Sequence, residues 1–117
     1  MNAHITEISH KGKAIIKVDY RGLSSEDAVT VMRDLHDTQL ARGPVVLTLA
    51  DVSDSHISEL MRTKGMEYAK DIEAKGIQSY MAMIGVSGMQ RLIMNAFSRA
   101  LYFAKDDTDA LEWLVKK

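Results

Sequence analysis

The chain has 117 residues, of which 46% are hydrophobic and 26% charged, with one proline and no cysteine. This length and composition indicate a single folded domain over residues 1–117 and argue against disorder. Fifteen basic and 16 acidic residues leave a net charge of -1, so no overall positive field recruits nucleic acid. This balance does not exclude a local basic patch.

The absence of cysteine excludes disulfides, thiolate metal sites and cysteine nucleophiles. It also favours a reducing compartment. The first residues, MNAHITEISHKGK, contain no apolar signal core, and no run of the sequence approaches the length of a membrane span. We therefore expect a cytoplasmic protein.

A β-hairpin and a helix are predicted first along the chain. Residues His4–Ser9 alternate between apolar and polar, a glycine turn follows, and Ala14–Tyr20 is rich in β-branched residues. Serines and acids at Ser24–Asp27 then predict a helix start, and Gly43-Pro44 predicts its end. The apolar face of this helix would consist of Ala28, Val31, Met32 and Leu35.

The second half of the chain alternates between strands and helices. Three strands are predicted at Val45–Leu49, Ile77–Ile84 and Leu101–Ala104. One helix is predicted from Ser58 to Gly76, a second from the turn Gly85–Gly88, and a third, capped by Asp106 or Asp107, at the C-terminal end. The residues expected to be buried on these helices are Ile57, Leu60, Met61, Tyr68, Ala69 and Ile72 on the first and Leu111, Trp113 or Leu114 on the last.

The predicted order is therefore β-β-α-β-α-β-α-β-α. Strands that alternate with helices pair in parallel through right-handed crossovers, and the opening hairpin adds an antiparallel edge. The sequence thus predicts an α/β sandwich with a mixed sheet. In such sheets ligands bind beyond the carboxyl ends of the strands, which here means the loops at residues 51–58 and 85–88.

The turn Gly85-Val86-Ser87-Gly88 offers three interpretations at first sight. A nucleophile elbow needs a glycine two residues after the serine, and Met89 stands there. A phosphate-binding loop needs a lysine followed by a serine or threonine after the second glycine, and neither is present. Two interpretations remain: Ser87 caps a helix, or Gly85, Ser87, Gly88 and Arg91 bind an anion.

The loop at residues 51–58 contains Asp51, Asp54 and His56 together with three serines. It lacks the spacing of a known metal motif, so we expect no metal ion and no other cofactor. Phosphorylation of a serine in this loop would add nearly two negative charges beside the predicted ligand edge. Turn and capping residues explain the same composition without a function.

Methionines are frequent around the strand and helix near residue 85, at Met81, Met83, Met89 and Met94. They would suit an adaptable apolar pocket, and they would equally suit an ordinary core. Met94 lies outside the centre of the apolar stripe that includes Phe97. An exposed Met94 would extend an apolar surface for a ligand or a partner helix, or it would be an isolated surface methionine.

Four segments, taken in order, resemble the SpoIIAA-like branch of the STAS superfamily. They are KVDYRGL at residues 17–23, LTLADVS at residues 47–53, the turn GVSG at residues 85–88 before Asn95-Ala96, and ALEWL at residues 110–114. The resemblance covers nearly the whole chain. It implies a small cytoplasmic α/β domain without catalytic activity.

The resemblance also implies two kinds of function. In anti-sigma factor antagonists of this superfamily, a partner kinase phosphorylates a serine at a helix start, in an Asp-Ser-Ser-Gly-like motif, and so switches protein binding. Here the region reads Asp54-Ser55-His56-Ile57-Ser58, without the second adjacent serine and the glycine. The resemblance leaves Ser55 and Ser58 as the candidates for phosphorylation. The similarity of this branch to lipid-binding CRAL-TRIO domains implies an apolar ligand and reversible membrane contact.

Two hypotheses follow. The chain is a binding domain for a small apolar or anionic, lipid-like ligand held between residues 51–58 and 85–91, with Met94 and Phe97 as apolar contacts. Alternatively, it is a protein-interaction switch controlled by a serine. No nucleophile with a base, no carboxylate pair and no metal set points to an enzyme. Homodimerisation, through the hairpin edge or the Met94 side, stays open.

Overall fold

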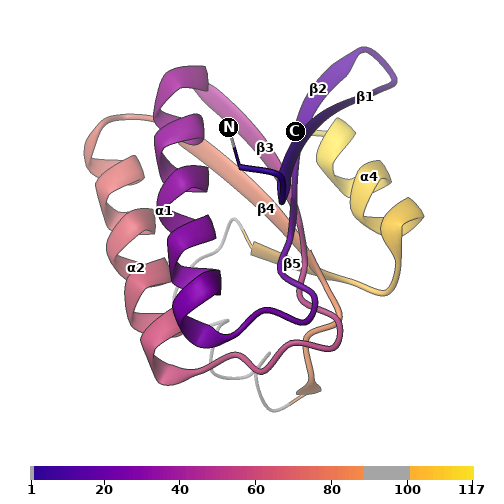
Figure 1. The fold of residues 1–117 in the computed structure, drawn as a ribbon. Coiled ribbons are helices and arrows are strands. Elements are labelled where there is room, and N and C mark those ends of the chain that lie inside the picture. Colours follow the sequence, from indigo (N-terminus) through magenta and orange to yellow (C-terminus); the bar gives the residue numbers. More distant parts are fainter. Residues whose placement is uncertain (1, 89–100) are drawn as a thin grey trace.

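The fold is built around one mixed sheet (Figure 1). The computed structural model describes residues 2–88 and 101–117 of the chain. Its strands lie in the order β1-β2-β3-β4-β5. Strand β1 pairs antiparallel with β2, whereas β2, β3, β4 and β5 pair in parallel. The predicted mixed sheet with an opening hairpin is therefore confirmed. The strand bounds are β1 Ile5–His10, β2 Lys13–Asp19, β3 Val45–Asp51, β4 Gln78–Ile84 and β5 Leu101–Ala104.

Helices cover both faces of the sheet. Helices α1 (Ser25–Arg42) and α2 (Glu59–Ala74) lie side by side on one face, and α4 (Asp107–Val115) covers the other (Figure 1). The helix predicted after the turn at residues 85–88 falls mostly on residues 89–100, which lie outside the described part of the chain. This arrangement places α2 over the same face of the sheet as Met81 and Met83 of β4.

Side-chain caps begin the described helices where the sequence predicts them. The Oγ atom of Ser24 accepts a hydrogen bond from the Asp27 amide at 3.2 Å, and Ser58 does the same for α2. Asp106 rather than Asp107 caps α4, accepting from the Asp109 amide at 2.8 Å. Each cap satisfies an amide that the first helical turn would leave without a partner.

The hydrophobic core has two layers, separated by the sheet. Strand β3 contributes to both, because its apolar residues alternate between the two faces: Val46 and Ala50 pack under α1 and α2, while Leu47 and Leu49 pack under α4. All four are buried. The continuous apolar run of the sequence is thus the central strand, covered on both sides.

Two residues of α2 are not buried as predicted. Leu60 is 45% exposed because it lies about 100° around the helix from its neighbour Met61, which packs into the core. Ala69 is exposed as well, on a part of α2 that borders a cavity. On α4, Leu114 is the fully buried anchor, and Leu111 and Trp113 are partly buried beside it.

Candidate functional site

The carboxyl ends of the parallel strands meet at one edge of the sheet, as predicted. The Tyr20 amide donates to the Asp51 carbonyl oxygen at 2.9 Å, and the Val52 amide donates to the Ile84 carbonyl oxygen at 2.9 Å. These bonds continue the β2–β3 and β3–β4 ladders into the loops. The loop after β3 and the turn after β4 therefore start side by side.

Close packing of Gly85 on Ser53 joins these two loops. Gly85 has a φ of +86°, and a Cβ atom there would lie 2.5 Å from the Ser53 Oγ and 2.6 Å from its backbone nitrogen and Cα. The position demands glycine both for its left-handed backbone and for the close approach. This structural requirement accounts for Gly85 without a ligand.

Charged residues at this edge are largely paired with one another. The Arg21 guanidinium donates two hydrogen bonds to the Asp19 carboxylate, at 2.9 and 3.0 Å, and its Nε atom lies 3.8 Å from Asp51 Oδ2. The hydrogen bonds from Arg21 lower the pKa of Asp19 to about 2. Asp51 also accepts from the Ser53 amide at 2.9 Å. Arg21 is thus committed to carboxylates.

Four residues predicted to bind ligand lie on the surface of this edge: Asp54, Gly85, Ser87 and Gly88 are exposed. Asp54 adopts a φ of +54°, which a short polar side chain tolerates in a turn. Arg91, the cation of the predicted site, lies outside the described residues, and so do the proposed apolar contacts Met94 and Phe97. The described part of this edge carries three carboxylates, those of Asp19, Asp51 and Asp54, beside the one arginine Arg21, which does not favour an anion.

The two candidate phosphorylation sites differ in their surroundings. The Ser55 Oγ atom is buried and makes no hydrogen bond within the described structure. The Ser58 side chain is half-buried and accepts a hydrogen bond from the Met61 amide at 3.2 Å, which makes it the cap of α2. A kinase would therefore reach Ser58 more readily than Ser55.

Over residues 2–88 and 101–117, no group of three or more His, Asp or Glu side chains is placed to hold a metal ion.

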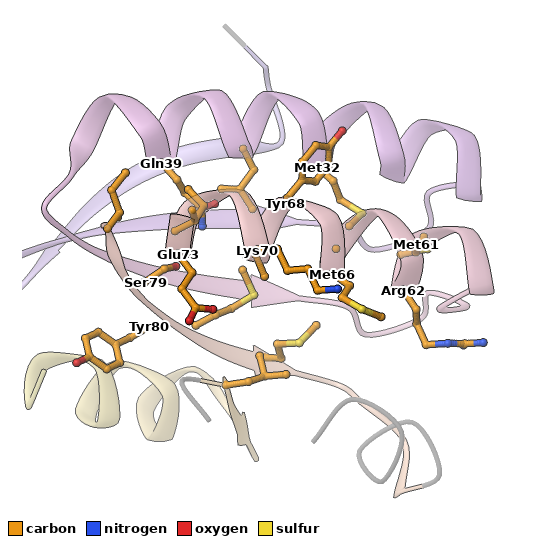
Figure 2. Close-up of a pocket in the computed structure, with 18 of the residues that line it drawn as sticks. Met32, Gln39, Met61, Arg62, Met66, Tyr68, Lys70, Glu73, Ser79 and Tyr80 are labelled. Carbon is orange, nitrogen blue, oxygen red and sulfur yellow. The ribbon is translucent and has the colours of Figure 1, made fainter. Parts of the chain in front are cut away.

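A cavity lies between α2 and β4, away from the loops at the carboxyl ends of the strands (Figure 2). Its volume is about 640 Å³, within the range of small-molecule sites. Its walls come from four elements of the fold. They include Met32 and Gln39 of α1, Met61 and Met66 of α2, Met81 and Met83 of β4, and Leu101 of β5. The cavity lies on the α1 and α2 face of the sheet, and its walls include Val52 and Ile57 from the loop after β3.

Methionine is the distinctive component of these walls. Every methionine in the described residues lines the cavity, namely Met32, Met61, Met66, Met81 and Met83. Met61 and Met83 are buried, and the other three are partly exposed toward the cavity. Methionine has an unbranched, polarisable side chain that adapts to ligands of different shape.

Polar groups of the cavity are either satisfied or at its mouth. Inside, the Gln39 amide nitrogen donates to the Thr48 hydroxyl at 3.0 Å, and both residues are buried. At one end, Arg62 donates to the Ile57 carbonyl oxygen at 3.1 Å. Lys70 and Glu73 of α2 are exposed, and both line the cavity (Figure 2). Lys70 forms no ion pair with a described residue.

The described walls of the cavity are mostly apolar and carry few ionisable groups. Glu73 is the one carboxylate among them, and they contain no histidine. They therefore provide no carboxylate pair and no histidine-activated nucleophile of the kind that acid–base or covalent catalysis uses. They provide apolar surface for the body of a ligand and charges at the mouth for a polar end.

Sequence reasoning located only part of this site. Met81 and Met83 were expected to suit an adaptable pocket and an ordinary core equally; both line the cavity, Met83 belongs to the core cluster under α1 and α2, and Met81 packs against it. None of the described residues predicted to bind ligand, Asp51, Asp54, Gly85, Ser87 and Gly88, lines it. The α2 residues Met66 and Lys70 were missed; the one signal was the count of eight methionines in the chain.

Comparison with models of known protein families found no match, and comparison with curated protein sequences found none either. Within residues 2–88 and 101–117, no helix combines the length and apolar character that crossing a membrane requires.

Proposed function

We propose that this chain is a SpoIIAA-like STAS domain without catalytic activity, which binds a small apolar or amphipathic, lipid-like ligand. The family proposal rests on the four sequence segments at residues 17–23, 47–53, 85–88 and 110–114. The mixed sheet, with its opening hairpin and helices on both faces, is compatible with it.

One observation carries the binding proposal: all the methionines of the described residues surround one cavity of about 640 Å³. A plain core would close such a space, because interiors pack to the density of organic crystals. The cavity takes the apolar body of the ligand, and Lys70 at the mouth favours a negatively charged end. The proposed ligand site is therefore under α2 rather than at the loop edge that the sequence indicated.

Methyl-labelled methionine provides the direct test. Protein with ¹³C in its methionine methyl groups is titrated with decanoic acid, and the methyl signals of Met66 and Met81 are followed by NMR. We expect saturable shifts at the cavity methionines, because each lies in the wall that the ligand contacts. Native mass spectrometry of protein purified from cells would then identify the natural ligand by its added mass.

A filled cavity supplies the matched variant. Ala69→Phe introduces a ring on the cavity side of α2, whereas Ala74→Phe makes the same change on the same helix away from the cavity. Both alanines are exposed, so neither change disrupts the core. Ala69→Phe should abolish the decanoate shifts, and Ala74→Phe should retain them.

Residues 89–100 join β4 to β5 in the chain, so the test must include them. Nuclear Overhauser contacts from the methyl groups of Met66 and Met81 to side chains of residues 89–100, together with absence of decanoate binding, would mean that the chain fills its own cavity. That result would overturn the proposal. Equal decanoate binding by the Ala69 and Ala74 variants would also contradict it.

A second candidate function, a phosphorylation-controlled interaction switch, is favoured by the position of Ser58. Its half-buried hydroxyl caps a helix of 16 residues, where the helix dipole stabilises a phosphate. Pull-downs should compare Ser58→Asp with Ser58→Asn, because both side chains preserve the cap and only aspartate adds charge. Identical partners for the two variants would remove this candidate.

A further inference from the structure

Three aromatic side chains gather on the face of the sheet opposite the cavity. Tyr102 of β5 stacks on Trp113 of α4, with ring centroids 4.9 Å apart and an interplanar angle of 8°. Tyr80 of β4 meets Trp113 edge-on, at 6.3 Å and 73°. Figure 2 shows the Tyr80 ring pointing toward α4 and away from the methionine-lined cavity. Trp113 and Tyr80 thus form an aromatic corner.

Hydrogen bonds hold Tyr102, the ring stacked on Trp113, in place. The Tyr102 hydroxyl donates to the two Asp109 carboxylate oxygens, at 2.9 and 3.1 Å, and Asp109 Oδ2 also accepts from the Lys105 amide at 3.0 Å. These contacts fix the Tyr102 ring against one face of Trp113. The other face of the indole is left for a different partner.

That partner is an ammonium group of the same chain. The Nζ atom of Lys117 lies 4.6 Å from the Trp113 ring centroid and 5.8 Å from that of Tyr80. Both distances are within the range of cation–π attraction. Lys117 pairs with no carboxylate of the described residues, so the aromatic rings are the groups there that attract its charge.

We propose that the aromatic corner of Trp113 and Tyr80 binds the trimethylammonium group of a small solute, and that the ammonium group of Lys117 competes with this solute for the two rings. A primary ammonium is strongly hydrated and loses much of that hydration against a ring. A quaternary ammonium spreads its charge over methyl groups that contact the rings directly, and aromatic surfaces recognise it for this reason. The corner is therefore better matched to a trimethylated cation than to the lysine it holds.

Tryptophan fluorescence reports on the corner directly, because Trp113 is the one tryptophan of the chain. Choline chloride is titrated at constant ionic strength, balanced with sodium chloride. We expect a saturable change in Trp113 emission, with half-saturation on the order of tens of millimolar for two partly buried rings. The neutral isostere 3,3-dimethyl-1-butanol has the same shape without the charge and should produce no saturable change.

Two pairs of variants separate the competitor from the walls. Lys117→Ala removes the tethered ammonium and should lower the half-saturating choline concentration at least about threefold, because a tethered group competes at high effective concentration. Lys116→Ala makes the same change in net charge beside it and should leave binding as in the wild type. Tyr80→Phe keeps the aromatic face and should retain binding, whereas Tyr80→Leu should weaken it.

Three results would overturn the proposal. They are an equal effect of choline and 3,3-dimethyl-1-butanol, an unchanged choline response in Lys117→Ala, and equal binding by Tyr80→Phe and Tyr80→Leu. Phosphatidylcholine vesicles form a further arm of the experiment. If they change Trp113 emission and free choline does not, the cation belongs to a membrane surface and the small-solute proposal is wrong.

Discussion

The Nε2 atom of His36 lies 2.7 Å from Asp71 Oδ2 and joins α1 to α2 across the wall of the cavity. The imidazole of His36 also stacks on Tyr68, with ring centroids 4.6 Å apart, and Tyr68 lines the cavity. Lys75 donates to both Asp71 oxygens at 2.6 Å from the next turn of α2. Asp71 thus bonds both to His36 of α1 and to Lys75 at the end of α2.

The first prediction concerns the pH dependence of this contact. Hydrogen bonds from Lys75, and then from His36, lower the pKa of Asp71 below its ordinary 3.8. The stabilisation is therefore fully present above pH 3.8 and is lost as the pH falls through the lower pKa of the folded state. Urea unfolding of Asp71→Asn and wild type should differ at neutral pH and converge in acid. A difference unchanged between pH 7 and pH 2 would contradict this assignment. Asp37→Asn, which removes an exposed carboxylate of α1, is the control.

Gly85→Ala should destabilise the fold by about 2–5 kcal/mol, the sum of a left-handed backbone cost and an overlap with Ser53. Gly12 also has a positive φ, of +81°, but nothing lies within 4 Å of its missing Cβ. Gly12→Ala should therefore cost only about 1–2 kcal/mol. Equal midpoints for the two variants in thermal or urea unfolding would show that the contact with Ser53 carries no weight.

The buried pair of Gln39 and Thr48 offers a test of polar satisfaction beside the cavity. Thr48→Val keeps the shape of the side chain but leaves the Gln39 amide without its acceptor, which should cost about 1–3 kcal/mol. Adding Gln39→Leu removes the unsatisfied group and should recover part of that loss. A double-mutant cycle measured by urea unfolding checks this, and strictly additive losses would count against a coupled pair.

Truncation of two leucines to alanine, at Leu114 and at Leu60, should have contrasting effects on stability. Leu114 is fully buried and anchors α4 on the sheet, so Leu114→Ala should cost about 2–5 kcal/mol. Leu60 is 45% exposed, and Leu60→Ala should change stability by no more than about 0.5 kcal/mol. Calorimetric unfolding of both variants measures the difference. If Leu114→Ala lowers the free energy of unfolding by no more than about 0.5 kcal/mol, as expected for Leu60→Ala, α4 contributes little to the stability of the domain.

Lys70 should select the charged end of a ligand in the cavity. In Lys70→Gln, binding of decanoic acid should weaken about two- to fivefold, as expected for an exposed ion pair, while binding of decanol stays unchanged. Lys64→Gln removes a charge from the same helix outside the cavity walls and serves as the control. Loss of affinity for acid and alcohol alike would show that Lys70 acts through its packing rather than its charge.

Local features of the sequence predicted most elements of the described fold. Ser24, Ser58 and Asp106 start helices because their side chains satisfy amides within the same turn, and the apolar run at β3 reports burial on both faces. These are short-range effects, so the residues beside one another in the chain determine them. The parallel order of β2 to β5 follows from the same alternation of strands and helices.

Contacts between distant segments decided the rest. Arg21 pairs with the Asp19 carboxylate two residues before it, but Asp51 reaches that pair only because β2 and β3 lie side by side. The stack of Tyr102 on Trp113, and the methionines of α1, α2 and β4 around one cavity, likewise depend on packing between elements. The sequence by itself determined where helices and strands begin and which faces are apolar, because those depend on local hydrogen bonds and periodicity. Only the tertiary structure decided that the methionines surround a space, and that the described parts of the predicted ligand loops contribute only Val52 and Ile57 to its walls, since a cavity is a property of how separate elements pack.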